Sequence, residues 1–343
     1  MKRFAIPLTA LILLALACNL EQAAIPTSAP ATVEPSPNTP TPSGGSERHC
    51  GDGICDGPEN KTNCPEDCPA GEASPVPEED VYWATNPASG ARLYVQLIHP
   101  QDWSGEMLPT LVLVPGGSGD SSNFLDSPQK TRALTDAGFT LVVFDPDGRG
   151  HSEGVEDDDG YVHQDGLAEI IRFAATLPEV DAEQIGLVSY SYGVTMAAGA
   201  LARHPDLPVR FFIDWEGPAN RNDTGGCDEA KTGHLQGHPC DDEDFWRERE
   251  AATFALQLQV PYQRLQSEKD HAQPDNEHAL MMIANATAEV YGGHGQAPWT
   301  RLNDLAPNTV YSVDAPPPMI PEGEDQKLAA LIVRYATELL RLP

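Results

Sequence analysis

Ser191 is the residue whose setting most clearly predicts chemistry, because it stands between a short apolar run and an Ala-rich segment. The run over residues 185–188 predicts a buried strand, and the segment after the serine predicts a helix. A serine in a tight turn at that junction is exposed, and the helix dipole favours negative charge there. The turn requires small neighbours two positions away, which are Ser189 and Gly193 in this chain. The pattern predicts a nucleophilic Ser191, with the Tyr192 amide donating to an oxyanion.

The segments around this turn alternate between strands and helices. Continuous apolar runs at residues 110–114 and 140–144 predict buried strands, and residues 128–138 and 165–175 predict helices. Such alternation predicts a mostly parallel sheet flanked by helices and joined by right-handed crossovers. The fold class expected from the residues is therefore α/β.

Three blocks of residues resemble those of α/β-hydrolases, near the dienelactone hydrolase and peptidase-like branches. In chain order they are residues 115–117 (Pro-Gly-Gly), 145–152 (Asp-Pro-Asp-Gly-Arg-Gly-His-Ser) and 189–193 (Ser-Tyr-Ser-Tyr-Gly). Ser189 departs from the family pattern, which has glycine there. The resemblance spans roughly residues 81–342 and implies an α/β-hydrolase fold. It also implies a second oxyanion donor in the loop after an early strand, which we assign to the Gly117 amide.

The resemblance further implies an acid and a histidine that follow the serine along the chain. A strand is expected over residues 257–265, and the family places its acid in the loop after such a strand, which points to Asp270. The family histidine comes later still, and His294 is the only histidine after the helix expected over residues 277–286. Its Gly-Gly-His-Gly setting suits an exposed loop. We therefore expect a catalytic triad of Ser191, Asp270 and His294.

His271 is an alternative base, because no clear apolar strand stands directly before His294. It would follow the penultimate strand, and its acid would be Glu216 or Asp214 after the apolar run at residues 211–213. The remaining alternatives are His278, His151 or no catalytic histidine.

The chain begins with two basic residues, a short apolar run and small residues before Cys18. This pattern is typical of an export signal, and the run is short for a membrane span. Residues 14–18 resemble the lipobox of prokaryotic lipoproteins, which implies that residues 1–18 are a lipoprotein signal ending in a lipidated Cys18 on the outer face of a prokaryotic membrane. The alternative is an ordinary signal cleaved after Ala17. Residues 19–48 are rich in Pro, Thr, Ser and Ala and predict a disordered, extended tether.

A cysteine-rich module is expected over residues 49–70. In an exported protein, four close cysteines predict two disulfides, with a zinc site as the competing interpretation. The stretch resembles small C-G-D-G-x-C repeats of secreted microbial proteins, which implies a module and no activity. The cysteines are Cys50, Cys55, Cys64 and Cys68. The same stretch offers carboxylates that could bind calcium: Asp52, Asp56, Glu59 and Asp67.

Residues 220–249 interrupt the alternation of strands and helices and are rich in polar and acidic side chains. We interpret them as a lid insertion in the hydrolase domain, which covers residues 78–343. The insertion holds Cys227 and Cys240, and an oxidising compartment favours a disulfide between them that closes the lid.

The formal net charge of −31 over 343 residues argues against nucleic acid as a partner. The chain carries no phosphate-binding loop or dinucleotide fingerprint, so we expect no organic cofactor and leave calcium open. We predict a surface-anchored serine hydrolase that acts on small carboxylic esters, in preference to peptides or amides. The alternative is a non-catalytic binding protein on the same scaffold, with a calcium- or partner-binding module.

Overall fold

The computed structural model describes residues 80–224, 238–321 and 327–342. The chain divides into two units, Met1–Gly44 and Gly45–Pro343, and all described residues belong to the second.

Several predictions concern residues outside the described ranges and stay predictions. They are the lipidation of Cys18, the tether at residues 19–48, the cysteine-rich module at residues 49–70 and the pairing of Cys240 with Cys227, of which only Cys240 is described.

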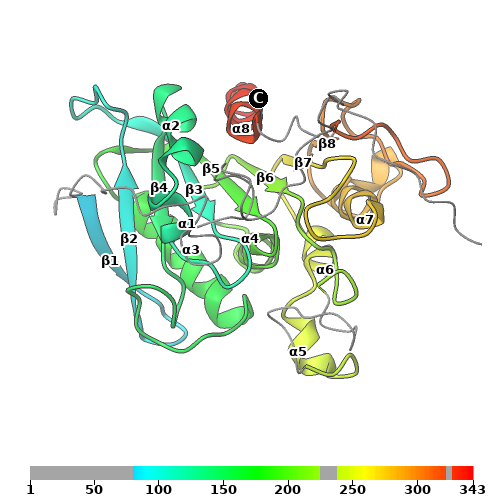
Figure 1. Ribbon diagram of the computed structural model, residues 1–343, viewed down its shortest axis with the longest axis horizontal. Coiled ribbons are helices and arrows are strands. Elements are labelled where there is room, and N and C mark those ends of the chain that lie inside the picture. The colour runs from blue at the N-terminus through cyan, green and yellow to red at the C-terminus, as the bar shows by residue number, and fades with distance from the viewer. Residues whose placement is uncertain (1–79, 225–237, 322–326, 343) are drawn as a thin grey trace, which may run out of the picture. The chain divides into compact units, whose positions relative to one another are not determined.

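One sheet of eight strands forms the centre of the described part, in the order β1-β2-β4-β3-β5-β6-β7-β8 (Figure 1). The strands are β1 (Val81–Thr85), β2 (Arg92–Ile98), β3 (Leu108–Val114), β4 (Thr140–Phe144), β5 (Val180–Tyr190), β6 (Phe211–Trp215), β7 (Tyr262–Leu265) and β8 (Thr300–Leu302). The pairs β1–β2 and β2–β4 are antiparallel, and the pairs from β4–β3 to β7–β8 are parallel. The predicted mostly parallel α/β sheet is confirmed.

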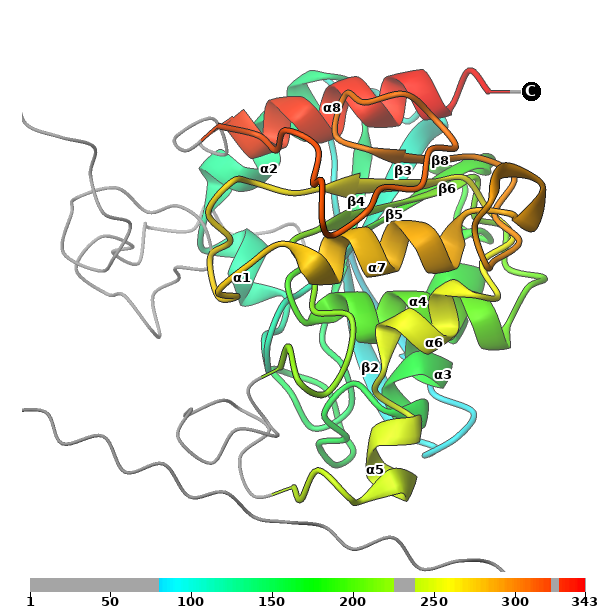
Figure 2. The ribbon, with the colours of Figure 1, turned by 90° about the vertical axis from the view of Figure 1, so that its right-hand side faces the viewer.

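Helices cover both faces of this sheet. Figure 2 shows α2 and α8 on one face and α3, α4, α6 and α7 on the other. The helices are α1 (Ser122–Leu125), α2 (Pro128–Asp136), α3 (Tyr161–Ala174), α4 (Gly193–Arg203), α5 (Glu243–Arg247), α6 (Ala251–Ala255), α7 (Glu277–Ala286) and α8 (Leu328–Leu339), with a 3₁₀ turn at Glu289–Tyr291. None of the helices in the described ranges combines the length and apolar character that a bilayer span requires.

Neighbouring residues of the central strands bury their side chains on opposite faces of the sheet. In β5, Leu187 packs in the layer with α3 and α4, and Val188 packs in the layer with α2 and α8. In β3, Val112 packs in the layer with α3 and α4, and Leu113 packs in the layer with α2 and α8. Because both faces are covered, the central parts of these strands are apolar on both sides, which is why the sequence shows continuous apolar runs.

The last two strands of the sheet, β7 and β8, are short. The strand predicted over residues 257–265 begins only at Tyr262, and the short helix α6 ends before the predicted strand, at Ala255. β8 is three residues long, Thr300–Leu302, and pairs with β7 at the edge of the sheet. A strand this short and polar shows no periodicity, so its position could not be predicted from the sequence.

Candidate active site

Ser191 lies in the turn between β5 and α4, with a backbone φ of 50°. A residue with a Cβ is strained in this left-handed conformation, and such strain is common at functional sites. The Ser191 N–H donates to the Trp215 carbonyl at 2.8 Å, which ties the turn to the neighbouring strand β6. A Cβ on Gly193 would lie 2.4 Å from the Pro115 carbonyl oxygen. The prediction that position 193 requires a very small residue is confirmed.

His271 follows β7 and brings its imidazole against this serine. Its Nε2 lies 2.8 Å from the Oγ of Ser191, and its Nδ1 lies 2.8 Å from Oε2 of Glu216. A carboxylate at Nδ1 keeps the ring proton on that nitrogen and leaves Nε2 free to accept the serine proton. The ends of β5, β6 and β7 thus present side chains with the geometry of a nucleophile, a base and an acid.

Glu216 is fully buried at the end of β6, where backbone donors hold its carboxylate. Oε1 accepts a hydrogen bond from the N–H of Ser267 at 3.0 Å, and Oε2 accepts one from the N–H of His271 at 3.2 Å. Trp215 stacks on the His271 ring with centroids 4.8 Å apart. These contacts restrict both the carboxylate and the ring to one orientation.

Asp214 belongs to a different buried network. Its carboxylate forms an ion pair with Arg264 and accepts a hydrogen bond from the Tyr262 hydroxyl at 2.8 Å. Of the two acids considered for His271, the structure brings Glu216 to the ring and pairs Asp214 elsewhere.

Asp270 is a second carboxylate beside the same imidazole, although it is more distant than Glu216. Its Oδ1 lies 3.5 Å from Nδ1 of His271, while its Oδ2 lies 3.2 Å from Nε2 of the buried His278. Burial raises the pKa of Asp270, but the close contact with His278, the charge of His271 and a hydrogen bond from Gln266 outweigh it and hold the pKa well below its usual value. Asp270 therefore stays ionised next to the candidate base.

The loop after β3 packs directly against the serine turn. A Cβ on Gly116 would lie 2.7 Å from the Tyr190 carbonyl oxygen and 3.0 Å from the Cβ of Ser191. Gly117 comes next, with a φ of +58°, a conformation that glycine adopts without strain. Tyr192 directly follows the serine and is buried. Of the two residues expected to supply oxyanion donors, Tyr192 therefore directly follows Ser191, and Gly117 directly follows a glycine that packs against it.

The sequence model of the X-Pro dipeptidyl-peptidase family (S15) matches residues 89–285, more than half of the chain. The chain belongs to this S15 family. This membership makes the protein a hydrolase of the serine type.

Solved structures resemble the S15 chain in fold but share little sequence with it. Est1E from Butyrivibrio proteoclasticus, solved with ferulic acid, is 14% identical with a TM-score of 0.55, over 76% of this chain and 100% of that chain. Dipeptidyl peptidase 4 from Porphyromonas gingivalis is 16% identical with a TM-score of 0.52, over 76% of this chain and 35% of that chain. The acylaminoacyl peptidase of Pyrococcus horikoshii is 15% identical with a TM-score of 0.51, over 77% of this chain and 42% of that chain. The chain thus spans less than half of either peptidase, and these likenesses show the fold alone. No curated protein sequence matches it.

In this S15 chain the expected pairing of Ser191 with His294 is not found. His294 is exposed in the loop ahead of β8, and its N–H donates to the Ala284 carbonyl at 2.9 Å. Ser191 and His271 follow the carboxyl ends of parallel strands, whereas a residue ahead of β8 precedes the amino end of a strand. This difference in strand polarity explains why His271 meets the serine and His294 does not.

One group of side chains in the described ranges could together hold a metal ion, namely Glu216, Asp270 and His271. Their ligand atoms lie within 4.8 Å of one another. In this S15 chain those atoms already make the hydrogen bonds and ion pairs described above. The group is therefore better suited to orienting an imidazole than to holding a resident cation.

Proposed function

We propose that this chain hydrolyses esters or short peptides through a triad of Ser191, His271 and Glu216. The contact between the Ser191 Oγ and the His271 Nε2, 2.8 Å, carries the proposal, together with the Glu216 contact at Nδ1. Such a chain of contacts is what nucleophilic catalysis by serine requires.

The reaction follows from this geometry. Ser191 Oγ attacks the substrate carbonyl carbon while its proton passes to His271 Nε2, and Glu216 stabilises the resulting imidazolium. The negative oxygen of the tetrahedral intermediate accepts hydrogen bonds from the amides of Gly117 and Tyr192. His271 then donates the proton to the leaving alcohol or amine as the carbonyl re-forms. Water, deprotonated by the same nitrogen, releases the acid from the acyl-enzyme.

Fluorophosphonate labelling tests the proposal, because the probe reacts with serines that a base activates. We expect labelling of the intact protein and none of Ser191→Ala or His271→Ala. His294→Ala is the matched control, since that histidine is exposed, and it should label normally. Labelling of His271→Ala at the normal rate, or its loss in His294→Ala, would contradict the triad.

Family membership supports peptides beginning with X-Pro as substrates, alongside the small esters expected from the sequence. Turnover of an X-Pro p-nitroanilide and of a p-nitrophenyl acyl ester, compared by kcat/KM, would separate these classes. A panel in which neither compound reacts with a labelled enzyme would point to an acyl group outside both classes.

We also propose that the domain is anchored outside the cell through a lipid on Cys18 and that a Cys227–Cys240 disulfide closes the lid. The lipobox-like residues 14–18 support the lipid anchor. The oxidising compartment that an exported protein enters supports the disulfide. Mass spectrometry of unreduced peptides checks the disulfide.

A further inference from the structure

Arg149 stands out as a buried cation that the proposed reaction does not use. It lies in the loop after β4, and its side chain is only 3% exposed. Nε and Nη2 donate to the two carboxylate oxygens of Glu156 at 2.8 and 2.6 Å, and Nη2 also donates to Oδ1 of Asp159 at 2.8 Å. Two acids thus neutralise the guanidinium and orient its plane.

The remaining nitrogen of Arg149 faces the loop that carries the candidate oxyanion donor. Nη1 donates to the carbonyl oxygens of Gly117 and Gly119, each at 3.3 Å. The N–H of Gly119 donates to the Gly116 carbonyl at 3.0 Å, which closes a turn over residues 116–119. The peptide unit that contains the Gly116 carbonyl also contains the Gly117 N–H. The turn that presents this N–H is therefore held by one internal bond and by Arg149.

Gly117 has open space beside its α-carbon, where a Cβ would contact nothing within 4 Å, so no side chain of its own helps to fix the turn. Glycine also has the widest choice of backbone conformations. Catalysis requires the opposite, since an oxyanion donor stabilises the transition state only when its direction is set in advance.

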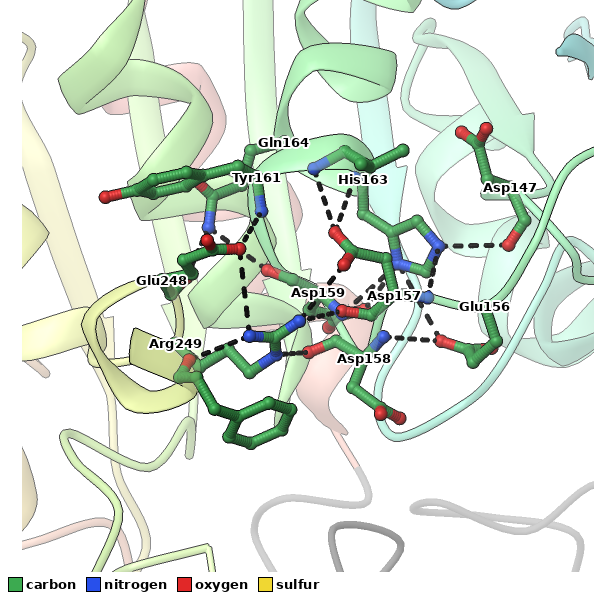
Figure 3. A network of polar contacts seen from close by, with 12 residues as sticks. Asp147, Glu156, Asp157, Asp158, Asp159, Tyr161, His163, Gln164, Glu248 and Arg249 are labelled. Carbon is green, nitrogen blue, oxygen red and sulfur yellow. Dashed lines mark hydrogen bonds and ion pairs between the residues drawn. The ribbon is translucent and has the colours of Figure 1, made fainter. Parts of the chain in front are cut away.

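The acids that hold Arg149 belong to an acidic loop, residues 153–159, which also reaches the second candidate donor. The Tyr192 hydroxyl donates to the Asp158 carbonyl at 3.2 Å. Arg249 donates to the same carbonyl at 3.1 Å and to Asp157, which fixes the loop from its other side (Figure 3). One loop therefore contacts Tyr192 directly and the Gly117 turn through Arg149.

We propose that Arg149 is a positioning residue for the oxyanion hole, which holds the turn at residues 116–119 against Ser191 and thereby directs the Gly117 amide. The inference rests on the proposed serine mechanism. Arg149 touches no reacting atom. Because Glu156 and Asp159 balance its charge, Arg149 contributes by setting the direction of the Gly117 amide.

Arg149→Ala tests the proposal in ester turnover. We expect kcat to fall about a hundredfold, as when an oxyanion donor is lost elsewhere, while KM changes by less than about threefold. The matched control is Arg203→Ala, which removes an ion pair with Asp165 and a bond to the Tyr161 carbonyl without touching the turn. Its kcat should stay within about twofold of the intact protein.

Chemical rescue separates positioning from a general loss of structure. Millimolar methylguanidine should restore much of the kcat of Arg149→Ala, because the small cation can occupy the vacated site and donate to the same carbonyls. It should do nothing for Arg203→Ala. If Arg149→Ala fails to fold, Arg149→Lys keeps the charge with a donor that cannot bind both Glu156 and the turn, and its kcat should still fall at least tenfold at normal KM.

Normal kcat in folded Arg149→Ala or Arg149→Lys would overturn the inference, as would a decrease of equal size in Arg203→Ala. A decrease in Arg149→Ala with no response to methylguanidine would assign Arg149 a purely structural role. These results are distinct from failure of the proposed function, in which the intact protein itself would neither label nor turn over esters.

Discussion

Replacement of Glu216 by glutamine removes the charge at His271 Nδ1 while it preserves the shape of the side chain. Glu216 accepts on both oxygens: Oε1 from the Ser267 N–H, and Oε2 from both the N–H and the Nδ1 of His271. An amide offers one acceptor and one donor, so it cannot reproduce this pattern in either orientation.

Each orientation of the new amide has a definite consequence. If its nitrogen faces His271, it donates to Nδ1, the ring proton moves to Nε2, and Nε2 can no longer accept the proton of Ser191. If its nitrogen faces Ser267 instead, the ring keeps its tautomer, but two buried donors oppose each other at a cost of about 1–3 kcal/mol and the imidazolium loses its counter-charge. Because the same neutralisation in a serine protease slows kcat about 10⁴-fold, we expect Glu216→Gln to lose about 10³–10⁴ in kcat, equivalent to about 4–5.5 kcal/mol.

The assay is p-nitrophenyl ester hydrolysis, with folding checked by circular dichroism. Asp270→Asn is the matched control, because it makes the same change on a carboxylate 3.5 Å from the same nitrogen. The asparagine oxygen can still accept from the N–H groups of Ala272 and Gln273, so we expect a loss of about tenfold or less. The low-field proton NMR signal of the Nδ1 proton should disappear in Glu216→Gln and persist in Asp270→Asn.

The reverse result would refute this reasoning. If Asp270→Asn loses three orders of magnitude and Glu216→Gln stays within tenfold of the intact enzyme, the acid is Asp270, as the position of that residue in the chain suggested. If both variants stay active, neither carboxylate orients the base and the triad must be abandoned.

Three further outcomes are expected. Gly193→Ala should lower the unfolding free energy by about 1–3 kcal/mol and reduce kcat, because the new Cβ would lie 2.4 Å from the Pro115 carbonyl oxygen; urea denaturation and ester turnover measure both. The pKa of Asp270 is depressed in the folded protein, so its stabilising contribution is complete above its unfolded pKa of about 3.9 and is lost as the pH falls below that value. Urea titrations below about pH 4 should therefore show a shallower loss of stability in Asp270→Asn. Cys18→Ser should move the protein from the washed membrane fraction to the soluble fraction, and retention in the membrane would exclude the lipid anchor.

Local chemistry was enough to predict the serine turn and its sheet. Ser191 is identifiable because a strand, a tight turn with Gly193 and a helix must follow one another within a few residues. The runs at residues 110–114 and 140–144 are apolar after their first residue because both faces of a parallel sheet are covered, so they too can be recognised without a structure. All of these signals arise between residues close together in the chain.

The partners of Ser191 depend on contacts between distant segments. His271 reaches the serine across 80 positions of the chain, and Glu216 reaches the histidine across 55. Two local features placed both residues among the alternatives: Glu216 follows the end of β6, and His271 follows the end of β7. Nothing local ranked them above Asp270 and His294.

Tertiary structure decided that ranking through β8. The strand is only three residues long, Thr300–Leu302, and it begins after His294. This histidine therefore stands ahead of the amino end of a strand, while the side chains of the proposed triad follow carboxyl ends. Glu216 in turn reaches His271 from a left-handed backbone with a φ of 48°. The direction of the edge strand and the strained φ of Glu216 are both set by packing across the whole sheet. Residue types along the chain therefore do not reveal them.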